Sequence, residues 1–348
     1  MKALYLWENQ RLSLEETDAP VLIDETDVIV RVTASSICGS DVHFWKGHIP
    51  YRPGFIIGHE FVGVIEQVGS KVSKFKPGDR VSAPAAPFCG ICPSCRAGKE
   101  YACTNGKGMF GGGGVAGVLP GAQAELIRIL FADTCLVKIP ESVSDKAALL
   151  VGDVLSTGYF AVINGAPQPG DDIVIFGAGP VGLCAVACAN LFSPARLIVV
   201  DIEENRLEVA LSLGATQVLN PQKGGDAKEI RRLTGGQGAH LAIDAVGLPA
   251  TLQQSIKSTC RGGTISMVGI GPPVIEFPMA EFFFKNLTLK GGYVPLNQMQ
   301  RLMQLIEVGK LDVSALITHQ IGLSDIIGGY EMFASKKDGC IKVMVVPD

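Results

Sequence analysis

Hydrophobic and polar positions follow one pattern in the first part of the chain. Up to about residue 150, short β-like runs such as Asp27–Val32, Phe61–Val68 and Ala124–Ile129 are separated by turns that contain Gly and Pro. Short strands between such turns predict an irregular, mostly antiparallel β domain.

A second pattern covers residues 154 to about 290, where short apolar runs alternate with helical stretches. The six runs are Ile173–Phe176, Leu197–Val200, Gln217–Leu219, Leu241–Ile243, Thr264–Val268 and Leu287–Leu289. Strands that alternate with helices predict βαβ units and a parallel sheet buried on both faces. We expect a doubly wound α/β fold, the kind of sheet that binds dinucleotides.

The remainder of the chain has two helix-like segments and a final strand-like run, Ile341–Val346. It is too short for a core of its own, so we expect it to pack onto the first domain. The predicted organisation is therefore a discontinuous domain of residues 1–153 and 293–348, with a nucleotide-binding domain of residues 154–292 inserted into it.

The composition limits the kinds of binding partner that we expect. The 348 residues are 18% charged and 47% apolar, with a net charge of −4. This is a globular composition, and the chain has no run of Lys and Arg that would indicate nucleic-acid binding. The nearly uncharged stretch Ile173–Val200 is long enough to span a membrane, but its glycines and prolines favour a buried strand, helix and strand. Since the N-terminus lacks the apolar region of a secretory signal, we expect a cytoplasmic protein without a membrane partner.

Four cysteines form a compact cluster with the spacing C-x2-C-x2-C-x7-C. Four thiolates this close together can surround one zinc ion and leave no open position, which is typical of a structural site. The alternatives are a chance cluster of cysteines and an iron–sulfur site, whose ligands can have a similar spacing. We expect a structural zinc lobe at residues 88–104 with the ligands Cys89, Cys92, Cys95 and Cys103.

A second candidate metal centre begins at Cys38, in ICGSDVHFW. His59, in GHE, follows twenty-one residues later. A catalytic zinc needs about three protein ligands and one open position, and a thiolate and an imidazole are suitable ligands. Taken alone, each residue is more often a buried apolar filler or a hydrogen-bonded histidine than a ligand.

A dinucleotide-binding pattern follows the run Ile173–Phe176. It reads GAGPVG and comprises Gly177, Gly179, Pro180, Val181 and Gly182, with a helical stretch after it. Glycines there permit a tight turn and bring a pyrophosphate close to a helix N-terminus. Asp201 ends the next strand, where its carboxylate can bind both ribose hydroxyls and would repel a 2′-phosphate, so NAD is favoured over NADP.

Taken together, these motifs carry a family resemblance. CGSDVH, GHEFVGVIEQVG, KPGDRV, the cysteine lobe, AEL, STG, GAGPVG and the Asp201 turn follow one another over nearly the whole length. In this order they resemble the zinc-containing medium-chain alcohol dehydrogenases. The resemblance implies a GroES-like β domain, a Rossmann domain, NAD, and two zinc ions per chain, one catalytic and one structural.

The same resemblance implies the ligands of the catalytic zinc. Cys38 and His59 match two family ligands. The third stands just ahead of the S-T-G turn and is Cys in many members, whereas VGDVLSTG offers Asp153. A carboxylate is a competent zinc ligand. A Cys/His/Asp set resembles the secondary-alcohol and formaldehyde dehydrogenase branches. Glu60 is expected either to approach the metal transiently or to act on it through its charge.

Further residues receive expected roles from the resemblance. Ser40 begins a proton relay that passes through the cofactor ribose to His43, and Asp41 orients the ligating histidine. Without the resemblance, Ser40 reads as a turn residue and His43 as a surface histidine. Arg206 lies near the adenosine ribose or on a solvated helix face. The expected contacts of the nicotinamide are Thr157, Val268, Gly269 and Ile270.

The function expected from the sequence is hydride transfer between a small or medium apolar alcohol, primary or secondary, and NAD. CGSDVHFWKG also resembles polyol (sorbitol-type) dehydrogenases, although VGDVLSTG counts against them, and threonine dehydrogenases match less well. A zinc-lacking or binding-only relative of the fold is a further alternative, against which the retained Cys38, His59 and Asp153 argue.

The sequence gives less direct support for the substrate pocket and for the oligomer interface. Phe44, Trp45, Phe88 and Phe110 either line an apolar substrate pocket or belong to the core. The family assembles into dimers or tetramers, often through the edges of its nucleotide domains. We therefore expect a homo-oligomer, with Glu276–Leu289 as edge-strand material.

Overall fold

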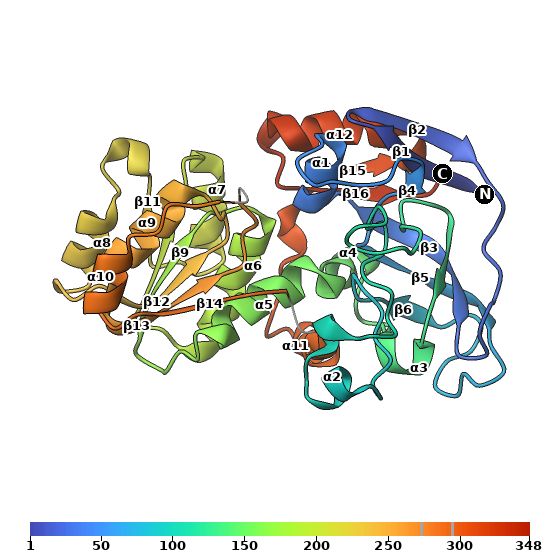
Figure 1. The fold of residues 1–348 in the computed structure, drawn as a ribbon, viewed down its shortest axis with the longest axis horizontal. Helices are drawn as coiled ribbons and strands as arrows, with labels where there is room; N and C mark the ends of the chain where they lie inside the picture. The colour runs from blue at the N-terminus through green and yellow to red at the C-terminus, as the bar shows by residue number, and fades with distance from the viewer. Residues whose placement is uncertain (272–273, 294–295) are drawn as a thin grey trace. The chain divides into compact units, whose positions relative to one another are not determined.

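The computed structural model describes residues 1–271, 274–293 and 296–348. These divide into two compact units, one made of Met1–Ser156 with Pro295–Asp348 and the other of Thr157–Val294 (Figure 1). The domain limits expected after residues 153 and 292 stay predictions, because compactness alone does not show which parts fold independently.

The first unit is built on two β-sheets. Its larger sheet has the order β15-β16-β3-β5-β6-β8, with β7 also paired to β3. Among these described strands only β15 and β16 pair in parallel, so the mostly antiparallel domain is confirmed. The smaller sheet has the order β2-β1-β4. The strands are β1 (Lys2–Glu8), β2 (Arg11–Glu16), β3 (Val28–Ser36), β4 (Phe55–Ile56), β5 (Phe61–Val68), β6 (Arg80–Ser82), β7 (Leu126–Ile129), β8 (Val137–Lys138), β15 (Ile317–Gly322) and β16 (Lys342–Val346).

Short helices connect these strands. They are α1 (Gly39–Trp45), α2 (Pro93–Arg96), α3 (Ala132–Cys135), α4 (Asp145–Leu149), α11 (Met299–Glu307) and α12 (Ile326–Ser335). The C-terminal elements α12 and β16 pack into the same hydrophobic core as β1 and α1, around Leu4, Phe44 and Tyr330. The C-terminal elements therefore belong to the same folded unit as the N-terminal ones.

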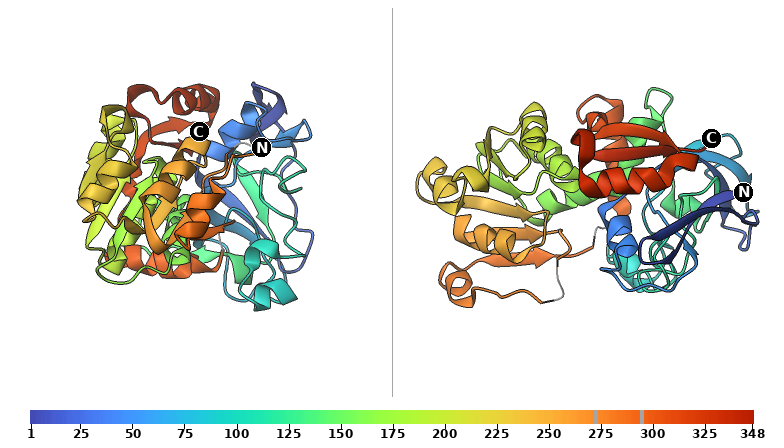
Figure 2. Two further views of the ribbon diagram at one scale, coloured as in Figure 1. Left: turned by 60° about the vertical axis from the view of Figure 1, so that its left-hand side comes forward. Right: turned by 90° about the horizontal axis from the view of Figure 1, so that it is seen from above.

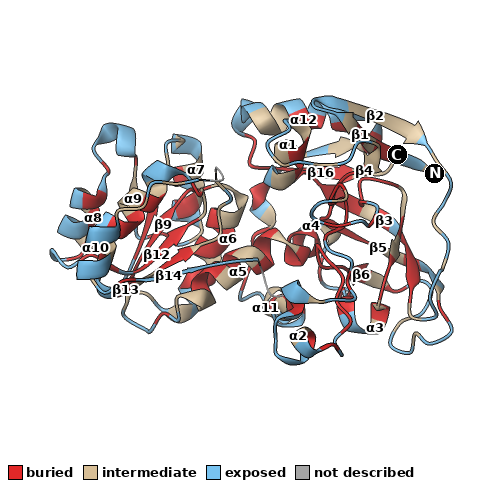
Figure 3. Cartoon of the chain, in the orientation of Figure 1, coloured by how far each residue is buried: buried red, intermediate tan, exposed pale blue. Residues whose placement is uncertain are grey.

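The second unit is a six-stranded sheet in which all neighbours are parallel, with the order β11-β10-β9-β12-β13-β14. Strand order reverses between β9 and β12, so the carboxyl ends of these two strands form a topological switch point. Every residue of β9 is buried, as expected for a parallel strand covered on both faces (Figure 3). The strands are β9 (Asp172–Phe176), β10 (Arg196–Val200), β11 (Gln217–Leu219), β12 (Ala239–Asp244), β13 (Thr259–Met267) and β14 (Thr288–Gly291).

Helices cover both faces of this sheet (Figure 2). They are α6 (Pro180–Ala189), α7 (Glu204–Ser212), α8 (Ala227–Leu233), α9 (Pro249–Ser258) and α10 (Met279–Phe284), and α5 (Val154–Asn164) leads into the unit. The doubly wound parallel sheet expected from the alternating pattern is thus confirmed. The stretch 173–200 is the expected strand, helix and strand, since it contains most of β9 and all of α6 and β10.

The structure corrects one smaller expectation and decides between the two alternatives of another. Only the last two residues of Glu276–Leu289 belong to the edge strand β14, because α10 occupies its middle. Phe44 and Phe110 are fully buried in hydrophobic clusters of the first unit, so they are core residues.

Over the described residues, no single helix has both the length and the apolar character needed to cross a membrane. The segments Asp145–Gly152 and Val154–Asn164 reach that length only together, as a bent pair.

Candidate functional site

Four metal-ligating side chains converge in the first unit. Ligand atoms of Cys38, His59, Glu60 and Asp153 all lie within 4.8 Å of one another. Cys38 is the residue just ahead of α1, His59 and Glu60 immediately precede β5, and Asp153 stands between a short 3-10 turn and α5. The structure thus brings together the three expected ligands and the expected neighbour.

The distances within this cluster fit a zinc ion. Oδ2 of Asp153 lies 3.5 Å from Sγ of Cys38 and 3.4 Å from Nε2 of His59. Tetrahedral ligands about 2.0–2.3 Å from zinc are separated from one another by about 3.3–3.6 Å. The 3.4 Å between Oδ2 of Asp153 and Nε2 of His59 also exceeds the roughly 2.7–3.2 Å of a good N–H···O hydrogen bond. The three groups therefore have the spacing of ligands around a cation.

The ionisation state of Asp153 is also compatible with a metal site. A thiol and two carboxylates meet in a place where His59 and Glu60 are almost entirely buried. Burial opposes ionisation of Asp153, but the nearby ring of His59 holds the pKa of Asp153 well below its usual range. The carboxylate of Asp153 is therefore available as a metal ligand near neutral pH.

Asp41 and Ser40 flank the cluster on α1. Asp41 is fully buried, and its Oδ2 accepts a hydrogen bond of 2.9 Å from the backbone N–H of Cys38. Its other oxygen, Oδ1, lies 3.3 Å from Nδ1 of His59. Ser40 places its Oγ 3.4 Å from Nε2 of His59, on the side of the ligand atoms. A carboxylate behind a ligating histidine fixes which ring nitrogen faces the metal.

His43 lies apart from these groups. Its Nδ1 lies 3.1 Å from Nδ1 of His48, near the C-terminal end of α1. Burial first, and then the neighbouring charges of His48 and Lys46, lower the pKa of His43. The ring is therefore mostly neutral at pH 7 and able to accept a proton, as a relay residue must.

Lys342 is a site residue that the sequence did not reveal. It lies in β16 and is fully buried, and its Nζ is 2.5 Å from Oε2 of Glu60 and 3.0 Å from the carbonyl oxygen of Ile37. Ser36 also donates a hydrogen bond to Glu60. Burial acts against a charge on Lys342, but the carboxylate of Glu60 outweighs it and raises the pKa of Lys342. A lone lysine in the apolar run KVMVV was the available signal.

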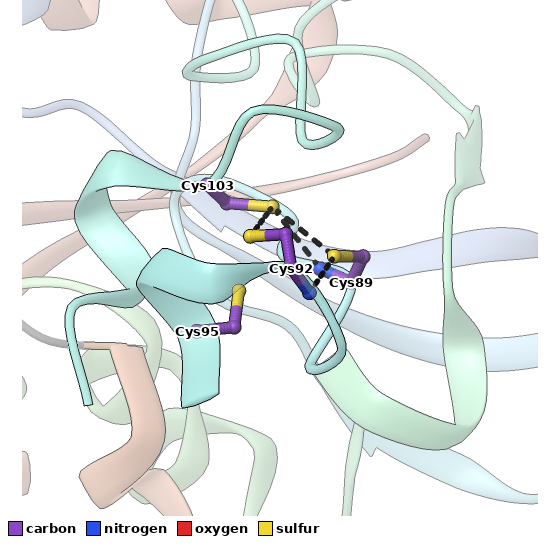
Figure 4. A group of neighbouring side chains, drawn as sticks. All are labelled: Cys89, Cys92, Cys95 and Cys103. Carbon is purple, nitrogen blue, oxygen red and sulfur yellow. Dashed lines mark hydrogen bonds between the residues drawn. The ribbon is translucent and has the colours of Figure 1, made fainter. Parts of the chain in front are cut away.

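The four cysteines of the second candidate centre also meet, and Figure 4 shows their sulfurs facing a common point. The sulfurs of Cys89 and Cys103 are 3.6 Å apart and those of Cys92 and Cys103 are 4.0 Å apart. Sulfurs around a tetrahedral zinc are separated by about 3.8 Å. Backbone N–H groups of Cys89 and Cys92 point at neighbouring sulfurs, at 3.3 and 3.4 Å, which favours the thiolate form.

The glycine-rich turn of the second unit lies where β9 ends, at the switch point. Gly177 has a φ of +95°, and a Cβ at Gly182 would lie 1.8 Å from the carbonyl oxygen of Gly177. Both positions therefore require glycine. A Cβ at Gly179 would meet only Nη1 of Arg206, at 3.9 Å, so this point of the turn is open. Pro180 and Val181 begin α6, whose N-terminus faces the turn.

Asp201 and the last strands complete this edge of the second unit. Oδ2 of Asp201 accepts a 2.6 Å hydrogen bond from the backbone N–H of Ala178, which ties it to the glycine-rich turn. Val268 and Gly269 donate to the carbonyl oxygen of Asp244 at 3.0 Å, so the segment after β13 is fixed to the end of β12. Ile270 is exposed beyond them. The expected cofactor residues thus gather at the carboxyl ends of β9, β10 and β13, while Thr157 lies on α5.

Two family models match the chain. Residues 24–141 match the alcohol dehydrogenase GroES-like domain, and residues 180–308 match the zinc-binding dehydrogenase domain. One model lies in the first unit and the other lies mainly in the second, and Asp153, Gly177 and Lys342 fall outside both matched ranges.

Individual relatives agree with the models. An alcohol dehydrogenase of Cupriavidus necator is 35% identical over 370 aligned positions, covering 100% of this chain and 99% of the relative. The sorbitol dehydrogenase of Bacillus subtilis is 32% identical, covering 100% and 98%. Among solved structures, alcohol dehydrogenase TADH from Thermus sp. ATN1 matches with a TM-score of 0.94 and 36% identity over the full length of both chains. The chain therefore belongs to the zinc-containing medium-chain alcohol dehydrogenase family.

Proposed function

We propose that this chain transfers a hydride between a primary or secondary alcohol and NAD, with an aldehyde or ketone as product, at a zinc held by Cys38, His59 and Asp153. The convergence of these three side chains at ligand-to-ligand spacing carries the proposal. When bound, zinc acts as a Lewis acid that lowers the pKa of an alcohol hydroxyl, and the nicotinamide accepts the hydride.

The chain's own groups would handle the proton. Each oxidised alcohol gives up one hydride and one proton, and the proton has to leave a place where little water enters. Ser40 has its Oγ beside Nε2 of His59, so its hydroxyl is close to the place where the cluster would hold a substrate oxygen. We assign Ser40 as the first proton acceptor and His43 as the later one. Asp41 holds the ring of His59 by facing its Nδ1.

Glu60 is assigned an electrostatic role. Its Oε2 is engaged by Ser36 and by the buried ammonium of Lys342, which hold the carboxylate in place. Releasing it toward the metal would leave Lys342 buried without its counter-charge, which is costly. We therefore propose that Glu60 and Lys342 together adjust the charge around the ligands.

NAD is the proposed cofactor. The carboxylate of Asp201 lies under the glycine-rich turn and would repel the 2′-phosphate of NADP. The open side of Gly179 admits a pyrophosphate near the N-terminus of α6. We assign Arg206 to the adenosine ribose and Thr157, Val268, Gly269 and Ile270 to the nicotinamide. None of the ten cysteines forms a disulfide, which suits a reducing compartment, so we propose that the protein works in the cytoplasm.

We further propose a homo-oligomer that forms at the edge of the parallel sheet. All four residues of β14 are exposed, and so are Met279, Phe283 and Phe284 of the neighbouring α10. An exposed edge strand beside apolar side chains pairs readily with a second copy. Light scattering should give the mass of a dimer or tetramer, and a Phe283→Asp, Phe284→Asp variant should be smaller. A monomeric parent would contradict the assembly.

The proposed activity is tested by following NADH formation with primary alcohols, secondary alcohols and polyols in parallel. We expect turnover of apolar primary or secondary alcohols with NAD, and at least about tenfold weaker use of NADP because Asp201 faces the site of the 2′-phosphate. Sorbitol is included because a sorbitol dehydrogenase is among the relatives. Turnover confined to polyols would replace the substrate class, and no turnover of any substrate by a protein with two zinc ions would contradict the proposal.

A further inference from the structure

A buried chain of hydrogen-bonding groups leads from the C-terminal helix to the candidate metal cluster. The hydroxyl of Tyr330, in α12, donates a 2.7 Å hydrogen bond to Oε1 of Gln123. Nε2 of Gln123 donates to the carbonyl oxygen of Ser36 at 3.2 Å and lies 3.4 Å from Oδ2 of Asp41. Asp41 faces His59, so three side chains connect α12 with the ligand.

Burial makes this arrangement specific. The side chains of Tyr330, Gln123 and Asp41 are fully buried, and His59 is 2% exposed. No water can replace a lost partner there without a change of structure, so each group depends on the next. The Tyr330 hydroxyl and the Ser36 carbonyl also determine which way the amide of Gln123 points, because an oxygen must face the former and a nitrogen the latter.

The glycine ahead of His59 belongs to the same arrangement. Gly58 has a φ of +99°, and a Cβ at this position would lie 2.5 Å from Cγ of Gln123. The backbone of Ala122 also donates to the carbonyl oxygen of Gly58 at 2.9 Å. The Gln123 segment therefore packs against the backbone that carries His59, while its amide points at the carboxylate behind the His59 ring.

We propose that Gln123 and Tyr330 are positioning residues that hold Asp41 against His59 and thereby set how tightly the cluster keeps its metal. Tyr330 acts through Gln123, and Gln123 acts through Asp41; neither residue reaches the ligand atoms. The inference rests on the proposed function, since it needs zinc at Cys38, His59 and Asp153. In this arrangement α12 helps to retain the metal, although it is far from the three ligands in the sequence.

The test measures zinc release from the full-length, zinc-loaded protein in the presence of a chelator. The variants are Tyr330→Phe, which removes one hydroxyl and keeps the ring that packs on Trp45, and Gln123→Met, which keeps the length without the amide. Tyr5→Phe is the matched control, because it removes a tyrosine hydroxyl bonded to Thr17, outside this chain of groups. Thermal unfolding of all variants is measured alongside.

We expect the cluster zinc to leave about 10- to 100-fold faster in both variants, the usual effect of losing a group behind a metal ligand. The cysteine-bound zinc should leave at the parental rate, and the unfolding temperature should fall by a few degrees at most, because each variant leaves a buried polar partner unpaired. The double variant should resemble Gln123→Met alone, since Tyr330 acts through Gln123.

Release at the parental rate in Tyr330→Phe and Gln123→Met would overturn the inference and leave the proposed function standing. Faster loss of both zinc ions together with a lower unfolding temperature would also overturn it, because that is general destabilisation. Parental alcohol oxidation by Asp153→Ala would overturn the proposed function itself, and this inference with it.

Discussion

Replacing Asp153 by Ala should lower kcat for alcohol oxidation by roughly 1,000-fold. The substitution removes one of three ligands, so the zinc is either lost or left in a different geometry. A Lewis acid contributes several kcal/mol to stabilising the reacting oxygen, and losing about 4 kcal/mol corresponds to roughly three powers of ten in rate. The rate is measured by NADH formation at saturating alcohol and NAD, together with zinc content.

Two further variants make this result specific. Asp312→Ala removes an exposed carboxylate far from the cluster in sequence and should keep the parental rate. Asp153→Cys restores a zinc ligand of the type that many family members have, and it should recover part of the activity and the full zinc content. Parental activity in Asp153→Ala would show that Asp153 is not a ligand needed for the reaction.

Replacing Cys103 by Ser should remove one zinc ion and destabilise the protein without abolishing the chemistry. Cys103 lies close to the sulfurs of both Cys89 and Cys92, so its loss opens the cluster. Binding of a structural zinc is coupled to folding, and a loss of at least about 3 kcal/mol would lower the unfolding temperature by roughly 6–12 °C. Well below that temperature, NADH formation should persist.

The matched control is Cys260→Ser, a partly exposed cysteine of β13 outside both clusters. Its unfolding temperature should change by no more than about 2 °C. If Cys103→Ser keeps two zinc ions and the parental unfolding temperature, the four cysteines do not form a structural metal site.

Local patterns predicted the strands well where burial alternates or is continuous. Phe61–Val68 and Gln217–Leu219 match β5 and β11 at both ends, and the run Ile173–Phe176 lies inside β9. Successive residues of these strands meet a similar environment in the sheet, so the apolar run in the sequence indicates the extent of the strand. The interior of Glu276–Leu289 was predicted wrongly because α10 ends in a short apolar run, Phe282–Phe284, which periodicity alone cannot assign to a helix or a strand.

The ligand clusters were predictable because metal ligands have strict spacing or a family motif, whereas their supports were not. Lys342 reaches Ile37, and Tyr330 reaches Gln123, across 305 and 207 positions of sequence. Nothing local distinguishes Tyr330 from other buried tyrosines. Such groups become visible only when the fold brings them beside the ligands.

The central claim is that a zinc held by Cys38, His59 and Asp153 is required for hydride transfer from an alcohol to NAD. The most direct measurement follows NADH formation by one preparation while the more labile zinc is removed with a chelator and then restored. The account predicts that the rate falls in proportion to the loss of one zinc ion per chain and returns when zinc is added back. An undiminished rate with that zinc removed would contradict it.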